Sequence, residues 1–191
     1  MTRGSANSVI PALAGKHQTN SAETPIARRP TRRSAAGWDQ LMGHCIQAIV
    51  VASEIADRLR AAYPQLRCVS ARQGYMILPI DADFVDSVTG AQPPNSTDTF
   101  MLLTEAFGHF LRELSRFGPL AYIETEYFGG IGGQGAAVYA GREVILAPEW
   151  RESGVINRAL KQIGMRRRPF ADRFMALGLD AYRSNDDLME G

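Results

Sequence analysis

A dense glycine run constrains the fold of this chain more than any other feature of its sequence. Five of the seven residues from Gly129 to Gly135 are glycine, and apolar, strand-like residues flank the run on both sides. Glycine costs about 0.5 to 1 kcal/mol more than alanine in a regular element, so such a cluster indicates positive φ angles, a bulge or a close approach of backbone to another group. We therefore predict a structural loop between two strands, formed by Gly129, Gly130, Gly132, Gly133 and Gly135.

The same run matches a dinucleotide-binding pattern. Residues 130–135 read G-x-G-x-x-G after a strand-like segment. That fingerprint needs a helix that begins at the loop, because the helix amides hold the pyrophosphate. Residues 136–146 instead read as a hairpin with a tight turn at residues 140–142. A strand-connecting turn or bulge is therefore the preferred interpretation, and we predict no cofactor.

Length and composition predict one globular domain over residues 42–191. The chain has 191 residues, of which 45% are hydrophobic, enough for one core of ordinary size. Residues 1–41 are rich in Ser, Thr, Pro and Arg and hold six basic and two acidic residues, so we predict a disordered N-terminal extension. An organelle transit peptide and a natural start at Met42 are the alternatives for this segment.

Charge, cysteine usage and hydropathy limit the partners and the compartment that we expect for this chain. The remaining residues, 42–191, hold 15 basic and 18 acidic residues, which predicts no nucleic-acid partner for the folded body. Cys45 and Cys68 lack the paired spacing of a zinc or redox motif, so we predict buried thiols in the cytoplasm, with a disulfide between them as the alternative. No run of about 18 apolar residues is present, so we predict no membrane partner.

Hydrophobic periodicity predicts an α+β fold, in which a mostly antiparallel sheet of five or six short strands packs against two or three helices. Strand patterns cover residues 44–51, 66–71, 75–80, 120–128, 136–139 and 143–146. Helical patterns cover residues 54–63, 81–88, 98–117, 155–163 and 173–177. A homodimer is a further prediction, because a copy of the chain could cover a sheet edge near Pro79 or the hairpin.

Two glutamates mark the candidate site. Glu124 and Glu126 are two residues apart on a strand, so they project from the same face. That face also carries aromatic residues, which favours contact with a partner over acid and base catalysis. The predicted partner-binding residues are Tyr122, Glu124, Glu126, Tyr127, Phe128 and Gln134.

Other reactive side chains lack a supporting pattern. His44 and His109 supply only two metal ligands, so we predict no metal site. Ser115 has no nucleophile-elbow context, and we predict no catalytic residue. Residues 166–168 are three arginines at the end of a helical segment, where cations meet the helix dipole favourably; an anion site is the alternative.

Three segments together resemble a known group of sequences: residues 118–134, 156–164 and 174–179. They are similar to small uncharacterised bacterial proteins that resemble immunity proteins of polymorphic toxin systems. The resemblance covers roughly residues 42–187 and carries no catalytic residue. It implies a cytoplasmic, noncatalytic protein that binds another bacterial protein, such as a toxin.

Two hypotheses for function follow. The first is a noncatalytic protein-interaction module, in particular an immunity-type inhibitor, that uses the segment from Tyr122 to Gln134. The second is a small-molecule-binding protein or an enzyme that holds a polar ligand with Glu124, Glu126 and the amides of Gly129 to Gly135. The missing active-site pattern favours the first hypothesis.

Overall fold

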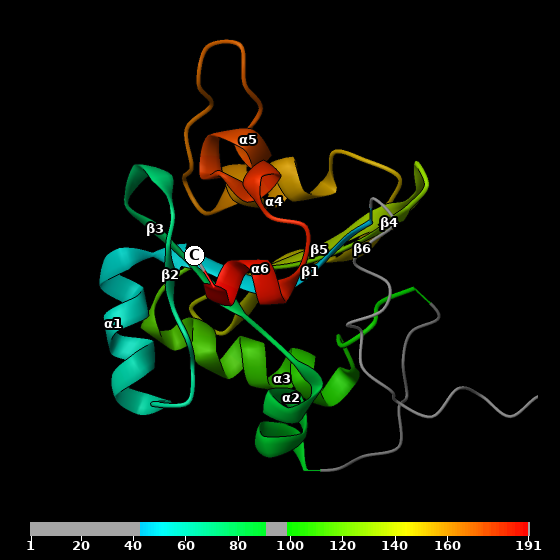
Figure 1. The fold of residues 1–191 in the computed structure, drawn as a ribbon. Coiled ribbons are helices and arrows are strands. Elements are labelled where there is room, and N and C mark those ends of the chain that lie inside the picture. The colour runs from blue at the N-terminus through cyan, green and yellow to red at the C-terminus, as the bar shows by residue number, and fades with distance from the viewer. Residues whose placement is uncertain (1–42, 91–98, 191) are drawn as a thin grey trace, which may run out of the picture. The chain divides into compact units, whose positions relative to one another are not determined.

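An antiparallel sheet of six strands organises the part of the chain that the computed structural model describes, residues 43–90 and 99–190. Its order is β2-β3-β1-β4-β5-β6 (Figure 1). The strands are β1 (His44–Ala52), β2 (Val69–Ser70), β3 (Tyr75–Pro79), β4 (Leu120–Phe128), β5 (Ile131–Ala140) and β6 (Glu143–Arg151). The extension predicted for residues 1–41 lies outside the described residues.

Strand β1 shows why the sheet is buried on both sides. Along this strand Ile49 and Val51 belong to one apolar cluster, whereas Ile46, Ala48 and Val50 belong to the other. Successive side chains of a strand point to opposite faces, so a strand with an unbroken apolar run, here residues 48–52, must be covered on both. The β-branched residues favour this conformation, because they pack well on a pleated surface.

Helices α1 (Ser53–Ala62), α2 (Ala82–Thr89) and α3 (Glu105–Leu114) cover the face that carries Ile49 and Tyr122. The buried stripe of helix α3, which includes Phe107 and Leu111, faces the sheet. The ring of Phe107 meets the ring of Tyr122 edge-on, with 5.5 Å between centroids. The side chain of Thr104 accepts a hydrogen bond from the amide of Phe107, so α3 begins well after the residue 98 that the sequence predicts.

The opposite face is covered by α4 (Val155–Gln162), α5 (Arg173–Leu177) and α6 (Asn185–Glu190). Figure 1 shows α4 and α5 across the sheet from α1 and α3. The α+β class and the antiparallel sheet are therefore confirmed. The predicted number of helices packed on the sheet, two or three, is too low, because residues 43–90 and 99–190 form six α-helices distributed over its two faces.

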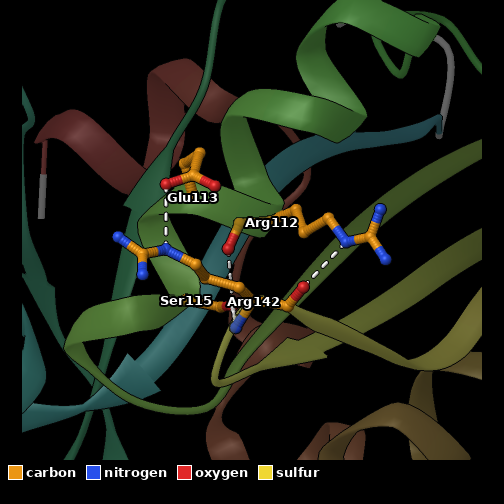
Figure 2. Close-up of polar contacts among 4 residues, drawn as sticks. All are labelled: Arg112, Glu113, Ser115 and Arg142. Atoms are coloured by element: carbon orange, nitrogen blue, oxygen red, sulfur yellow. Dashed lines mark hydrogen bonds and ion pairs between the residues drawn. The ribbon is translucent and has the colours of Figure 1, made fainter.

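The turn between β5 and β6 is attached to the end of α3 (Figure 2). Gly141 and Arg142 have positive φ angles of 58° and 69°, as a tight hairpin turn requires. The Arg142 amide donates to the Ser115 hydroxyl at 2.9 Å, and the Gly141 amide donates to the Ser115 carbonyl at 3.1 Å. Arg112 Nε donates to the Arg142 carbonyl at 2.7 Å, and Arg142 pairs with Glu113 at 3.0 Å. Ser115 is 1% exposed, so its hydroxyl has a structural role.

Strand β6 forms an open edge of the sheet that is poorly shaped for further pairing. Its register against β5 shifts between Ala136 and Val138 and again between Val138 and Tyr139. Pro148 lies in the same strand and has no amide to donate. Bulges and an edge proline protect a strand from pairing with another chain. The predicted homodimer therefore gains no support from this edge, and it stays a prediction.

Candidate functional site

The glycine run forms a tight hairpin and the start of a strand, whereas the sequence predicts a longer loop. Gly129 and Gly130, with φ angles of 58° and 83°, make the turn between β4 and β5. Phe128 and Ile131 lie opposite each other at the tip. Strand β5 then continues to Ala140, so no helix begins at the run, as the dinucleotide fingerprint would require.

The other three glycines lie in β5, where a side chain would collide with its surroundings. Gly132 has a φ angle of 145°, and a Cβ atom there would lie 1.9 Å from the Glu126 carbonyl oxygen. A Cβ atom on Gly133 would lie 2.4 Å from Nε1 of Trp150. On Gly135 it would lie 2.4 Å from the ring of Phe100. The strand therefore needs these glycines for close backbone and aromatic packing.

Glu124 is a buried anchor for the segment before α3. Its carboxylate is 0% exposed and accepts four hydrogen bonds. The amide of Met101 donates to Oε2 at 2.6 Å, and the amides of Leu102 and Leu103 donate to Oε1 at 2.9 and 3.1 Å. The Tyr122 hydroxyl donates to Oε1 at 2.6 Å. A buried carboxylate is tolerated here because donors surround it.

These contacts overturn the prediction that Tyr122 and Glu124 face a partner. Tyr122 is also 0% exposed, and burial, followed by the charge of Glu124, raises the pKa of its hydroxyl well above the usual value. Alternation along β4 correctly places Glu124 and Glu126 on one face. That face is covered by residues 100–103 at Glu124, and it is open at Glu126.

Tyr127 and Gln134 tie the hairpin to the start of α4. The Tyr127 hydroxyl donates to the Glu152 carbonyl, and Gln134 Nε2 donates to the Tyr127 hydroxyl at 3.0 Å. Gln134 Oε1 accepts from the amide of Ile156 at 3.0 Å. This bond satisfies an α4 amide that Gly154, at the helix N-cap, leaves without a side-chain partner. The side chains of Tyr127 and Gln134 thus fix the hairpin against the start of α4.

The tip of the hairpin is the exposed part of the predicted site. Phe128 is 52% exposed and Ile131 is 82% exposed, and Glu126 lies on the surface two residues before Phe128. The sequence does not single out Ile131, because this residue stands inside the glycine run. The signal that would have found it is the Gly-Gly pair, which marks a two-residue hairpin turn and pairs its two neighbours. We refer to Glu126, Phe128 and Ile131 as the hairpin tip.

The side chains of His44, His109, Cys45 and Cys68 do not form a cluster. Among the residues that the structure describes, no group of three or more His, Cys, Asp or Glu side chains is placed to hold a metal ion. His109 is exposed on α3, where its Nε2 lies 3.8 Å from Glu105. His44 Nδ1 lies 2.8 Å from the Thr125 hydroxyl, and its Nε2 is buried. Cys45 and Cys68 are not joined by a disulfide.

Lowering the pH is expected to destabilise the protein through His44. Burial lowers the pKa of this imidazole below its ordinary value of 6.5, and the charge of Arg183 acts in the same direction; the Leu179 backbone and Asp187 oppose it. Between the native pKa and 6.5 the unfolded chain binds more protons, so the free energy of unfolding falls as the pH falls through this window. One group can change that free energy by at most about 1.4 kcal/mol per pH unit.

Urea unfolding between pH 5 and 8 measures this effect. The His44→Gln variant should show a shallower pH dependence than the parent protein. His109→Gln, which changes an exposed histidine, is the matched control and should keep the parent slope. An equal slope for the parent protein and His44→Gln would mean that His44 takes up its proton equally in the native and unfolded chains.

Fold and site together define an α+β domain that presents a small apolar hairpin tip. Comparisons of the chain with protein-family models, with curated proteins and with solved structures find no match. Within residues 43–90 and 99–190, no helix is both long and apolar enough to cross a bilayer.

Proposed function

We propose that this protein is a noncatalytic protein-interaction module that binds its partner with the hairpin tip. The observation that carries the proposal is the cross-strand pair Phe128 and Ile131, which are 52% and 82% exposed at the end of the β4–β5 hairpin. Burying a large apolar side chain contributes about 1.5 to 3 kcal/mol, so such a pair is a strong anchor for a partner. Aromatic residues at interfaces commonly dominate the binding energy.

The hairpin is stiff, and stiffness supports binding. A two-residue turn joins its strands, and Tyr127 and Gln134 attach it to the segment before α4. A preorganised contact loses less conformational entropy when it binds than a flexible loop does. The hairpin tip therefore has the properties of a built recognition element.

The rival hypothesis, a ligand site made by two glutamates and the glycine amides, finds less support. The Glu124 carboxylate already accepts from three amides and the Tyr122 hydroxyl. The rings of Trp150 and Phe100 pack against the glycines of β5. Of the glutamates and glycines that the rival requires, Glu124, Gly133 and Gly135 are buried, whereas Glu126, Gly129, Gly130 and Gly132 are exposed. These contacts favour the interaction module.

An immunity-type inhibitor of a bacterial toxin is the finer form of the proposal. It rests on the resemblance of residues 118–134, 156–164 and 174–179 described above. The chain from residue 42 onward carries 15 basic and 18 acidic residues. A mildly acidic inhibitor would be captured faster by a basic toxin, because complementary charges steer association.

Affinity capture from cells that produce the protein tests the proposal. The parent chain and a Phe128→Ser, Ile131→Ser double variant serve as baits, and mass spectrometry identifies bound proteins and small molecules. We expect the parent to retain a stoichiometric protein that the variant loses, because two apolar anchors are removed from an exposed tip.

A Val144→Ser, Ile145→Ser double variant is the matched control. These residues are 44% and 45% exposed on β6, so the control removes a similar apolar pair from a different surface. It should retain the captured protein. Equal capture by the tip variant, or a bound metabolite with no protein, would contradict the proposed function.

A further inference from the structure

The connection between α4 and α5 carries an unusual combination of charge and exposed apolar surface. Residues 160–175 contain five basic residues and one acidic residue, whereas residues 42–191 as a whole have a net charge of −3. Arg166, Arg167 and Arg168 are all exposed, and Phe170 follows them. In Figure 1 this connection projects away from the sheet beyond α5. The proposed function does not use it.

Hydrogen bonds hold the connection at both ends, so the projecting residues have a defined backbone conformation. Met165 is 2% exposed, and its carbonyl accepts from Arg173 Nε at 2.8 Å. Gln73 Nε2 donates to the Arg166 carbonyl at 3.2 Å. The Ala171 amide donates to the Arg168 carbonyl at 3.3 Å, which closes a turn around Pro169 and Phe170. Residues 166–170 of this connection are therefore held in a defined arrangement.

Phe170 is in a conformation that a bulky residue rarely adopts. Its φ angle is 60°, and its side chain is fully exposed. This turn position favours glycine or asparagine, so phenylalanine there costs stability and gains no packing in return. Residues held in strained conformations cluster at functional sites, because local stability does not explain them. Phe170 is thus better explained by a contact outside the chain.

The acidic residue of the connection does not neutralise the arginines. Asp172 Oδ1 accepts from the amide of Met175 and caps α5, and Asp172 Oδ2 accepts from Asn157 Nδ2 at 2.8 Å. Both of its oxygens are therefore engaged on the α5 side of the turn. The guanidinium groups of Arg166 to Arg168 remain exposed and available to an external anion.

Residue type indicates what kind of anion fits. Protein interfaces are enriched in arginine, aromatic residues and methionine and depleted in lysine. Residues 160–175 contain four arginines and one lysine, Lys161, together with two phenylalanines and two methionines. Arginine pairs with carboxylates through two parallel hydrogen bonds, which lysine cannot do. Residues 42–191 have a net charge of −3, which disfavours approach to the extended negative surface of a lipid bilayer or a nucleic acid, so a local acidic patch on a protein is the better fit.

We propose that Arg166, Arg167, Arg168 and Phe170 form a docking surface for an acidic protein partner. Phe170 enters an apolar pocket of that partner, and the arginines pair with carboxylates around the pocket. This surface is separate from the hairpin tip. Docking of an acidic partner here does not require the hairpin tip to bind.

An NMR titration of the isotope-labelled full chain tests the docking surface. The probe is a synthetic peptide with a central tryptophan flanked by glutamates, and its matched peptide has glutamine at every glutamate. We expect the acidic peptide to shift resonances of residues 165–175 and to bind at least tenfold more tightly than the glutamine peptide. Phosphatidylserine vesicles and single-stranded oligothymidine are titrated in parallel.

Variants separate binding from folding. Phe170→Gly should weaken the acidic peptide at least tenfold, while thermal stability stays equal or rises because the positive φ angle no longer costs energy. An Arg166→Gln, Arg167→Gln, Arg168→Gln triple variant should remove the preference for the acidic peptide. Phe128→Ala, which changes the exposed phenylalanine of the hairpin tip, should leave the titration unchanged.

Three results would overturn the proposal. They are equal affinity for the two peptides, an unchanged affinity in Phe170→Gly, and tighter binding of vesicles or oligonucleotide than of the acidic peptide. The hairpin tip is tested separately, by affinity capture with the Phe128→Ser, Ile131→Ser variant, so failure of the docking surface and failure of the proposed function appear in different experiments.

Discussion

Replacing Glu124 with alanine is expected to lower the free energy of unfolding by about 4 kcal/mol or more. The substitution leaves the amides of Met101, Leu102 and Leu103 without an acceptor, and the buried Tyr122 hydroxyl loses its partner as well. Each unsatisfied buried polar group costs about 1 to 3 kcal/mol. The loss is a large fraction of the 5 to 15 kcal/mol that typically stabilises a domain, so urea unfolding will detect it.

Glu126→Ala is the matched control for this experiment. Glu126 has the same side chain on the same strand face two residues further on, but it is exposed. Its replacement should change stability by less than about 0.5 kcal/mol. Glu124→Gln should cost about 2 kcal/mol, because the amide keeps an acceptor oxygen and turns its donors toward the backbone amides. Equal losses for Glu124→Ala and Glu126→Ala would contradict the anchoring role.

The second large effect is expected from Gly132→Ala, with a loss of about 3 kcal/mol or more. A Cβ atom at this position would lie 1.9 Å from the Glu126 carbonyl oxygen and 2.7 Å from the Tyr127 Cα atom, and both are backbone atoms. Side-chain rotation cannot relieve such a collision, so the two strands must separate. The φ angle of 145° adds strain for any residue other than glycine. Thermal and urea unfolding measure the loss.

Gly129→Asn is the matched control at the turn. Gly129 also has a positive φ angle, 58°, but no atom lies within 4 Å of an added Cβ. Asparagine tolerates this conformation better than other residues with a side chain, so the variant should lose less than about 1 kcal/mol. A loss at Gly129→Asn as large as that at Gly132→Ala would show that backbone conformation, and not the collision, limits substitution in the hairpin.

Both experiments bear on the hairpin tip. Glu124 and Gly132 lie behind the tip, so variants at either position can weaken partner capture by loosening the hairpin. The tip residues Phe128 and Ile131 project beyond these supports. A loss of capture in the tip variant with unchanged unfolding would therefore report on contact with the partner. The stability measurements thus serve as the reference for the affinity experiment.

The sequence predicts the local elements well where one period dominates. The alternation of residues 120–128 and the turn at residues 140–142 predict the β4 strand and the β5–β6 hairpin, and both are present. The predicted helix over residues 98–117 is too long, because Phe100 and Leu103 fit the same apolar stripe as α3. The amides of residues 101–103 instead donate to the Glu124 carboxylate, which is more than 20 residues away in the sequence.

The sequence by itself determined which residues share a face of each strand, because side chains alternate with a period of two along the chain. It therefore placed Glu124 with Glu126 and predicted an antiparallel sheet. The tertiary structure decided what covers each face, because burial depends on contacts between segments far apart in the chain. Residues 101–103 close over Glu124 and leave Glu126 outside, and this contact separates a structural carboxylate from a surface one.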